Sequence, residues 1–247
     1  MANLKAIRIR LSSVRSTRQI TSAMKMVAAA KLRRAQDAIV QLRPYADKLN
    51  EIQASVCAAL RDTETENIYA QRKKGNGKVL IVVVTSNKGL CGAFNANVLR
   101  ETRRIMDERY SQENSRGDLG VMTVGKKAND ALRKLKCNII EDQSDLYTEL
   151  TFDRISALAD KLMRLYVSKE YDTIEIVYNQ FKNAAVQKLT NEVFLPVTMG
   201  TISGQDSAPA DYIYEPDQVR IISELIPKTL RIKLYRSLLD SFAAEHG

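Results

Sequence analysis

Tryptophan is absent from this chain of 247 residues, and aromatic side chains make up only 6% of it. Such scarcity fits long helices better than an aromatic-rich β-sandwich. No apolar run approaches the roughly 20 residues that a membrane-spanning helix needs, so direct insertion into a membrane is not expected. The cysteines (Cys57, Cys91 and Cys137) are scattered, and the only histidine is His246. This set argues against a disulfide framework and a zinc site, so no metal is expected, and it favours a reducing compartment.

Acidic residues are missing from residues 1–36, and the first one is Asp37. Basic residues in the same stretch contribute much of the net charge of +9. Several interpretations compete: a mitochondrial transit peptide, a helix that binds nucleic acid, a helix that runs beside an acidic protein surface, and a helix face that meets only solvent. The basic residues are Lys5, Arg8, Arg10, Arg15, Arg18, Lys25, Lys31, Arg33 and Arg34.

Glycine is also missing from residues 1–60, and the only proline there is Pro44. Apolar residues recur at alternating spacings of three and four, which is the pattern of a coiled-coil seam. The seam positions are Leu4, Ile7, Leu11, Val14, Arg18, Thr21, Lys25, Ala28, Leu32, Ala35, Ile39, Leu42, Ala46, Leu49, Gln53, Val56 and Leu60. A helix of this span would be about 85 Å long and would need a partner helix. Because a cleaved leader would end the pattern, its continuation past residue 36 counts against a transit peptide.

The seam has a polar gap at Arg18, Thr21 and Lys25. Around this gap the apolar positions shift to Ile20, Ala23, Met24 and Val27. The gap indicates either a stutter in the supercoil or a stretch that leaves its partner helix and meets another surface.

The rest of the chain has a different pattern. Residues 61–77 are polar, end in Gly-Asn-Gly and are interpreted as a linker. Between residues 78 and 211, strands are expected at 78–85, 118–125, 137–141, 171–181 and 187–198, and helices at 95–110, 126–135 and 152–167. This alternation predicts a mostly parallel sheet with helices on both faces. Pro196 favours an antiparallel edge position for the last strand.

A second long helix is expected from about Asp217, within a C-terminal coiled-coil segment at 212–247. Its apolar residues make it the natural antiparallel mate of the helix in residues 1–60. Those residues include Val219, Ile222, Ile226, Leu230, Leu234 and Leu238.

A glycine-containing loop, "TSNKGLCGAFNANV" at 85–98, follows the most hydrophobic run of the chain. It lacks the Lys-Ser/Thr of a phosphate-binding P-loop and has G-x-x-G rather than G-x-G-x-x-G. Its glycines are enough to let the chain turn sharply between strand and helix. Cys91 lies close to Lys88 and to a helix N-terminus, the surroundings of many reactive cysteines, but no histidine lies nearby in the sequence to form a nucleophilic pair. We therefore expect no catalytic residue and no cofactor.

The loop resembles one in the gamma subunit of F-type ATP synthases, where Ser-Asp-Arg-Gly-Leu-Cys-Gly is usual. Three other stretches are similar to that family in the right order: "RIRLSSVRSTRQITSAMKMVAAAKLRRAQ", "DYIYEPD" and "YRSLLDSFAAEH". This chain differs at Asn87 and Lys88, which stand where Asp-Arg is common and put an ion pair of that acid in doubt. The chloroplast-type cysteine insertion is absent. The family's last helix continues with Ala-Arg-Met, so the chain is expected to lack the end of that helix.

The resemblance implies a rotor. The terminal helices would form an antiparallel coiled coil beside a Rossmann-like α/β domain, inside a hexamer of alpha and beta subunits. Its foot would contact the epsilon subunit and the membrane ring of c subunits, on the cytoplasmic face of a bacterial inner membrane. The rotor would couple ring rotation to ATP synthesis without a catalytic residue of its own. The implied alpha/beta contacts are Arg18, Ile20, Thr21, Met24, Lys25, Met26, Lys88 and Cys91. The implied epsilon and c-ring contacts are Tyr212, Tyr214 and Glu215.

A basic α/β protein that binds nucleotide or nucleic acid through a helical arm is the alternative. It would explain the charge and the sheet. It explains neither the long seam nor the order of the motifs, so no nucleic-acid partner is expected.

Overall fold

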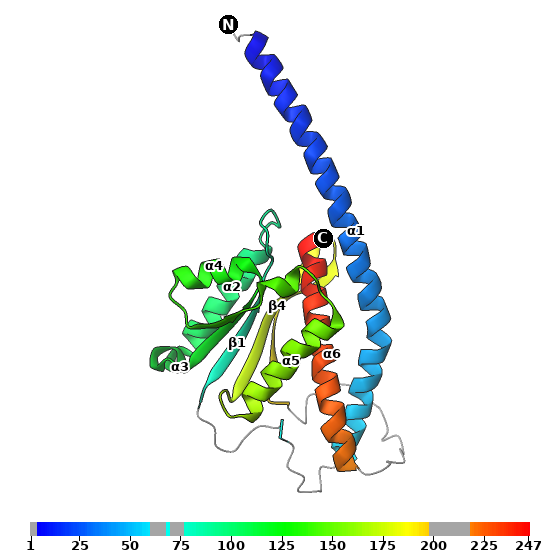
Figure 1. The fold of residues 1–247 in the computed structure, drawn as a ribbon, viewed down its shortest axis with the longest axis vertical. Helices are drawn as coiled ribbons and strands as arrows, with labels where there is room; N and C mark the ends of the chain where they lie inside the picture. Colours follow the sequence, from blue (N-terminus) through cyan, green and yellow to red (C-terminus); the bar gives the residue numbers. More distant parts are fainter. Residues whose placement is uncertain (1–3, 60–67, 70–76, 198–217) are drawn as a thin grey trace.

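Two long helices and a five-stranded sheet make up most of the protein (Figure 1). The computed structural model describes residues 4–59, 68–69, 77–197 and 218–247. The sheet has the order β3-β2-β1-β4-β5 and is parallel except between β4 and β5. This arrangement confirms the predicted fold class. The strands are β1 (Val79–Val84), β2 (Leu119–Val124), β3 (Ile139–Asp142), β4 (Thr173–Asn183) and β5 (Val186–Leu195).

The centre of the sheet is β1, whose six residues are all buried. A parallel strand covered on both faces reads as a continuous hydrophobic run, and β1 has that sequence. Leu80, Val82 and Val84 face a core that includes residues of α5 (Phe152–Val167) and α6 (Gln218–His246). The alternate residues face a core that includes residues of α2 (Phe94–Arg104) and α4 (Lys126–Lys134). The domain is therefore a three-layer α/β sandwich in which α6 belongs to one layer.

Helix α6 buries more than one face. Ile226, Leu230, Leu234 and Leu238 lie in the core of the α/β domain, although the sequence pattern pointed to this stripe as the mate of the N-terminal helix. Other α6 side chains contact that helix instead, namely Leu225, Ile232, Leu239 and Ala243. Apolar residues all round a helix are expected where it is covered on several sides.

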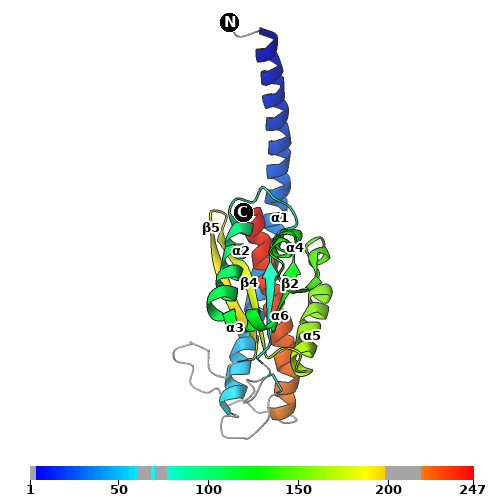
Figure 2. The same ribbon diagram turned by 90° about the vertical axis from the view of Figure 1, so that its left-hand side faces the viewer.

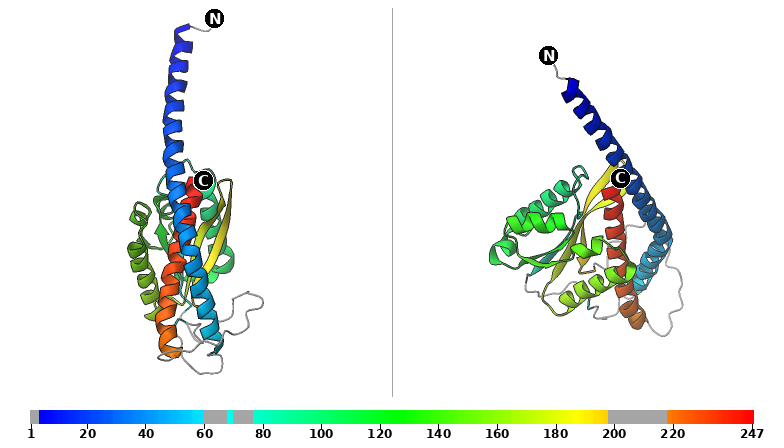
Figure 3. Two further views of the ribbon diagram at one scale, coloured as in Figure 1. Left: turned by 90° about the vertical axis from the view of Figure 1, so that its right-hand side faces the viewer. Right: turned by 45° about the horizontal axis from the view of Figure 1, so that its top comes forward.

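Helix α1 (Leu4–Ala59) runs antiparallel to α6 (Figure 3). Ala35 and Ile39 pack with Leu239 and Ala243. Further along α1, Ala46 and Leu49 pack with Ile232. Residue numbers therefore rise along α1 while those of its contacts in α6 fall, as in an antiparallel pair. These α1 residues are all predicted seam positions, and the seam is confirmed over this part of the helix.

The helix expected at 95–110 is divided. Helix α2 ends at Arg104, a π-helical turn η1 (Ile105–Arg109) follows, and α3 (Ser111–Arg116) begins after Tyr110. At this break Arg109 Nη1 and Tyr110 Oη donate hydrogen bonds to the buried carboxylate of Glu175 on β4, at 2.8 and 2.6 Å. A wider π turn changes the phase of a helix. Here it accompanies long-range hydrogen bonds to Glu175, which the local sequence pattern does not predict.

Candidate functional site

Residues 4–27 of α1, called the bare segment below, are exposed along their whole length. Figure 2 shows this part of α1 projecting beyond the rest of the protein. Its seam positions are uncovered: Leu4 is 66% exposed and Val14 64%. Because a row of exposed apolar side chains marks an interaction site, the bare segment is the first candidate site.

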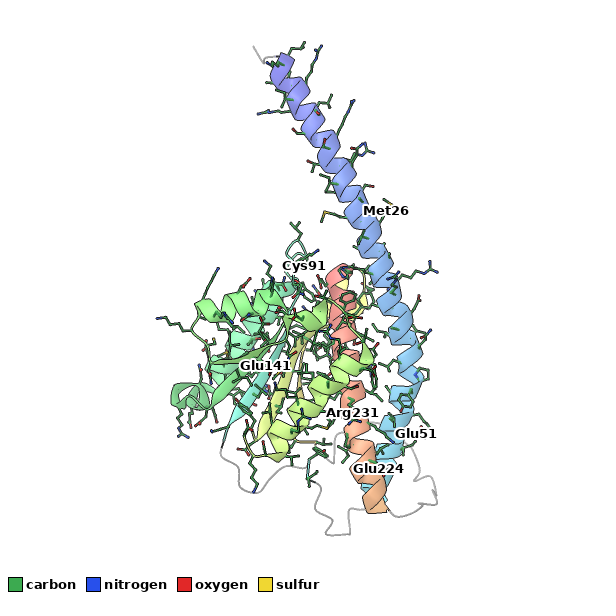
Figure 4. The ribbon with its side chains drawn as sticks, in the orientation of Figure 1. Met26, Glu51, Cys91, Glu141, Glu224 and Arg231 are labelled. Carbon is green, nitrogen blue, oxygen red and sulfur yellow. The ribbon has the colours of Figure 1, made fainter. Side chains whose placement is uncertain are left out.

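The predicted contacts on α1 all lie on the bare segment and are all exposed: Arg18, Ile20, Thr21, Met24, Lys25 and Met26. Figure 4 shows Met26 well above the α/β domain. The Thr21 hydroxyl donates to the backbone carbonyl of Thr17 at 3.0 Å, so it is used within the helix. The polar gap of the seam therefore lies where α1 has no partner helix among the described residues.

The bare segment also carries charge of one sign. It contains the first six of the basic residues and no acidic residue. Uniform charge on one element raises the surface potential and attracts surfaces of opposite sign. An acidic partner fits this segment better than a second copy of the same basic helix.

The second candidate site is the β1–α2 loop, residues 85–93. Its base is fixed by hydrogen bonds around Asn95, at the start of α2. Asn95 Oδ1 accepts from the Ser86 backbone nitrogen at 3.0 Å, and Asn95 Nδ2 donates to Ser86 Oγ at 2.8 Å and to Cys91 Sγ at 3.1 Å. These side chains bond one another, so the loop has a defined shape.

Asn87 ties this loop to two neighbouring elements. Its Nδ2 donates to the Ser144 carbonyl at 3.0 Å, and its Oδ1 accepts from the Lys126 backbone nitrogen at 2.9 Å. An aspartate could not donate the first of these bonds, because a carboxylate is an acceptor only. Asn87, which stands where aspartate is common in the family that the loop resembles, thus gives the loop a hydrogen-bond donor that it uses.

The loop does not have the form of a phosphate cradle. Donors at its base are taken up by its own acceptors, and Phe94 N, at the start of α2, donates to the Cys91 carbonyl at 3.2 Å. A Cβ at Gly89 or at Gly92 would meet nothing within 4 Å. Gly92 has a φ of +57°, so this glycine serves the backbone turn. Close packing requires glycine at a nearby position, because a Cβ at Gly125 would lie 2.0 Å from the Thr85 carbonyl oxygen.

The loop lies beside the C-terminal end of α6, where α1 becomes bare (Figures 1 and 4). Glu245 of α6 is the acidic group at this junction. Burial raises the pKa of Glu245 to about 7, while the positive charges of Lys31 on α1 and Lys88 in the loop act to lower it. Burial and the charge of Lys31 lower the pKa of His246 to about 4. Sequence reasoning missed this junction because its members are far apart in the chain.

Polar contacts hold α6 to the α/β domain. Arg231 Nε donates to Asp160 of α5 at 2.7 Å. Lys233 Nζ donates to the Val193 carbonyl of β5 at 2.7 Å, and burial lowers the pKa of Lys233. Tyr147 Oη donates to Ser241 Oγ at 3.1 Å. With the apolar core between them, these contacts make α6 and the domain one body.

The predicted foot contacts Tyr212, Tyr214 and Glu215 lie outside the described residues. So does most of the predicted linker at 61–77. Within the described ranges, no helix is long and apolar enough to cross a membrane, and no cluster of three or more His, Cys, Asp or Glu residues could hold a metal ion.

One half of α1 is bare, and the other half is joined through α6 to the α/β domain. This arrangement indicates the class of protein. It is a subunit of a larger assembly, with a projecting helix that other chains complete. A family model described as ATP synthase matches residues 3–247. The ATP synthase gamma chain of Christiangramia forsetii is 45% identical, and that of Flavobacterium psychrophilum 47%; each alignment covers all of this chain and 83% of the relative.

Among solved structures, the central stalk and c-ring of the Tetrahymena thermophila mitochondrial ATP synthase contains a similar chain. The two chains superpose with a TM-score of 0.62 at 23% identity, over 92% of this chain and 94% of the other. At that identity the likeness shows a shared fold. The family model and the two bacterial relatives show more: this chain belongs to the ATP synthase gamma-chain family.

Proposed function

We propose that this chain is the central-stalk rotor subunit of an F-type ATP synthase. Rotation of the membrane ring of c subunits turns it, and its asymmetric shaft drives the beta subunits in sequence through the conformations in which ATP is made or hydrolysed. The observation that carries the proposal is the division of α1. One half is fixed through α6 to the α/β domain, and the other half projects as a bare basic rod.

The chemistry of the bare segment suits a contact that must move. Exposed charge pairs contribute only about 0–1 kcal/mol each and are screened by salt, so they attract a partner without locking it. A beta subunit whose conformations fit one face of the rod differently has its populations shifted when the rod turns. Arg18, Ile20, Thr21, Met24, Lys25 and Met26, with Lys88 and Cys91 of the loop, would form this contact.

The remaining assignments follow from the same role. The segment with Tyr212, Tyr214 and Glu215 would contact the epsilon subunit and the c ring. The chain would contribute no catalytic group, since the side chains of the loop bond one another and Cys91 contacts Ser86 and Asn95, neither of which is a base. The two gamma chains named above are bacterial, which supports a place on the cytoplasmic face of the bacterial inner membrane, as a peripheral subunit.

Reconstitution tests the proposal. The purified chain is mixed with alpha and beta subunits, and we expect a stable complex in which ATP hydrolysis rotates a probe attached to the α/β domain. The chain alone, titrated calorimetrically with ATP and magnesium, should show no site. Failure to enter the complex would contradict the proposal, and a stoichiometric micromolar nucleotide site would favour a nucleotide-binding protein instead.

A further inference from the structure

A pocket of about 600 Å³ lies between α5, α6 and the short segment Ile68–Tyr69. Sites that bind small molecules commonly have volumes of about 300–1,000 Å³. Figure 4 shows Arg231, one of the lining residues, toward the end of the molecule opposite Met26 and Cys91. This pocket, called the α5–α6 pocket below, is therefore separate from both candidate sites described above.

The walls of the α5–α6 pocket are largely apolar. Met163 and Val167 of α5, Pro227 of α6 and Ile68 contribute to them. Ile68 is 58% exposed and Val167 43%, so the fold leaves apolar surface uncovered here. Removal of such surface from water is favourable, and the walls therefore favour a ligand with an apolar body.

The three parts of the chain that form the pocket are held together. Arg231 of α6 donates through Nε to Asp160 of α5 at 2.7 Å. The Tyr69 carbonyl accepts a hydrogen bond from the backbone nitrogen of Val197 at 2.8 Å, and the Tyr69 side chain packs against the core that α5 and α6 share. The pocket therefore has its shape before a ligand binds, as most small-molecule sites do.

Arginine side chains of the pocket have donors that the fold does not use. Arg164 is exposed and makes no side-chain hydrogen bond or ion pair with any residue that the structure describes. The Nη atoms of Arg231 likewise have no acceptor in that part of the chain. With Asp160 as the only acidic residue in the lining, one positive charge is left over. A guanidinium presents its N–H groups in a fork that matches a carboxylate or a phosphate.

We propose that the α5–α6 pocket binds an amphipathic anion, with its apolar body against Met163, Val167 and Pro227 and its oxyanion at the two arginines. Single-chain carboxylates and alkyl phosphates share this chemistry. A ligand in this position contacts α5, α6 and Tyr69 together, so it holds the N-terminal half of α6 against the α/β domain. The site does not depend on whether the chain is a rotor subunit.

Titration calorimetry of the full chain with decanoate, below its micelle concentration, tests the site. We expect one decanoate per chain. The thermal midpoint should rise with decanoate concentration, because a ligand that binds only the folded state stabilises it. Decyl phosphate should bind as well as decanoate. Decanol, which lacks the charge, should bind about tenfold more weakly. Binding of only one of the two anions would support the pocket and identify the headgroup.

Substitutions in the lining place the ligand. Arg164→Gln should weaken decanoate binding about tenfold. Val167→Asp, which puts a carboxylate in the wall, should abolish it. Both side chains are exposed, so the thermal midpoint of the unliganded chain should stay the same in each variant.

Matched controls remove an arginine elsewhere. Arg154→Gln, in the first turn of α5, should leave decanoate binding unchanged. Arg15→Gln is the second control, because a basic helix with exposed apolar residues could itself collect an anionic amphiphile. It should also leave binding unchanged.

Different outcomes would overturn the pocket. Equal affinities for decanol and decanoate would show that the arginines take no part. A loss in Arg15→Gln that matches the loss in Arg164→Gln would place the ligand on the bare segment. Absence of decanoate binding to the isolated chain would overturn the pocket and leave the proposed function untouched, whereas failure of the chain to enter the hexamer would overturn only the proposed function.

Discussion

The two halves of α1 share one helical backbone and one heptad pattern, and their surroundings differ completely. In the paired segment, residues 32–52, the seam residues Ala35 and Ile39 are 3% and 4% exposed, while in the bare segment the seam residues Ile7 and Leu11 are both 51% exposed. The pattern fixes which face of a helix can be buried. Whether that face is buried depends on what lies beside it, which here is α6 for one half only.

Substitution of Ile39 should give the largest difference between the halves. Ile39 packs with Leu239 and Ala243, so Ile39→Ala should lower the free energy of unfolding by about 2–5 kcal/mol. Ile9→Ala, in the bare segment, should change it by less than about 0.5 kcal/mol. Denaturant titration followed by circular dichroism measures both, and equal losses would show that the bare segment is packed in solution.

Hydrogen exchange should resolve the same boundary without mutation. Backbone amides of residues 39–49 are held in a packed helix pair and should exchange near the rate of global unfolding. Amides of residues 4–14 belong to the part of α1 that has no partner helix among the described residues; such a stretch is marginal in water, so they should exchange fast. Equal protection across both stretches would contradict the pairing register described here.

Met24→Lys should impair coupling with little effect on folding. Met24 is 49% exposed in the bare segment, and a new cation there can pair with a carboxylate on a passing subunit. An exposed ion pair contributes at most about 1 kcal/mol, so proton pumping per ATP should fall by no more than about fivefold. Val40→Lys is the control, because Val40 is 63% exposed on the outer face of the paired segment. A loss of helicity in Met24→Lys would refute this explanation.

Glu245→Gln should have the smallest effect, a change in the pH dependence of stability at the boundary between the segments. The pKa of Glu245 is raised from 4.5 to about 7. Its contribution to the free energy of unfolding is therefore present at low pH and is lost as pH rises through that window. The pKa of His246 is lowered from 6.5 to about 4, so its contribution is lost as pH falls through that window.

The two contributions oppose each other between pH 4.5 and 6.5. Urea midpoints of the unmodified chain should therefore change little over that range. In Glu245→Gln only the histidine contribution is left, and the midpoint should rise with pH. Parallel curves for the two proteins would contradict the raised pKa of Glu245.

The sequence predicted the elements well where a pattern is local. The seam at Ala35, Ile39, Ala46 and Leu49 and the buried run of β1 depend on spacing alone, and both are confirmed. Spacing could not assign the stripe from Ile226 to Leu238, because a period shows that a face is apolar and not which neighbour covers it.

Features that depend on distant residues were not predictable. The π turn at Ile105–Arg109 accompanies a hydrogen bond from Arg109 to Glu175 on β4. The junction of Lys31, Lys88 and Glu245 joins parts of the chain that only the fold brings together. The left-handed backbone of Leu90 depends on the hydrogen bonds of Asn87 and Asn95, and no motif in the loop predicts it.

The place of α6 in the core has a consequence for biogenesis. Chains fold as they leave the ribosome, N-terminal parts first. Yet α6 follows all five strands in the sequence and supplies Leu230, Leu234 and Leu238 to the core of the sheet. Until those residues emerge, α5 alone covers that face of the sheet, and the seam of the paired segment of α1 has no mate. Through most of its synthesis the nascent chain therefore exposes both surfaces, where chaperones can bind them.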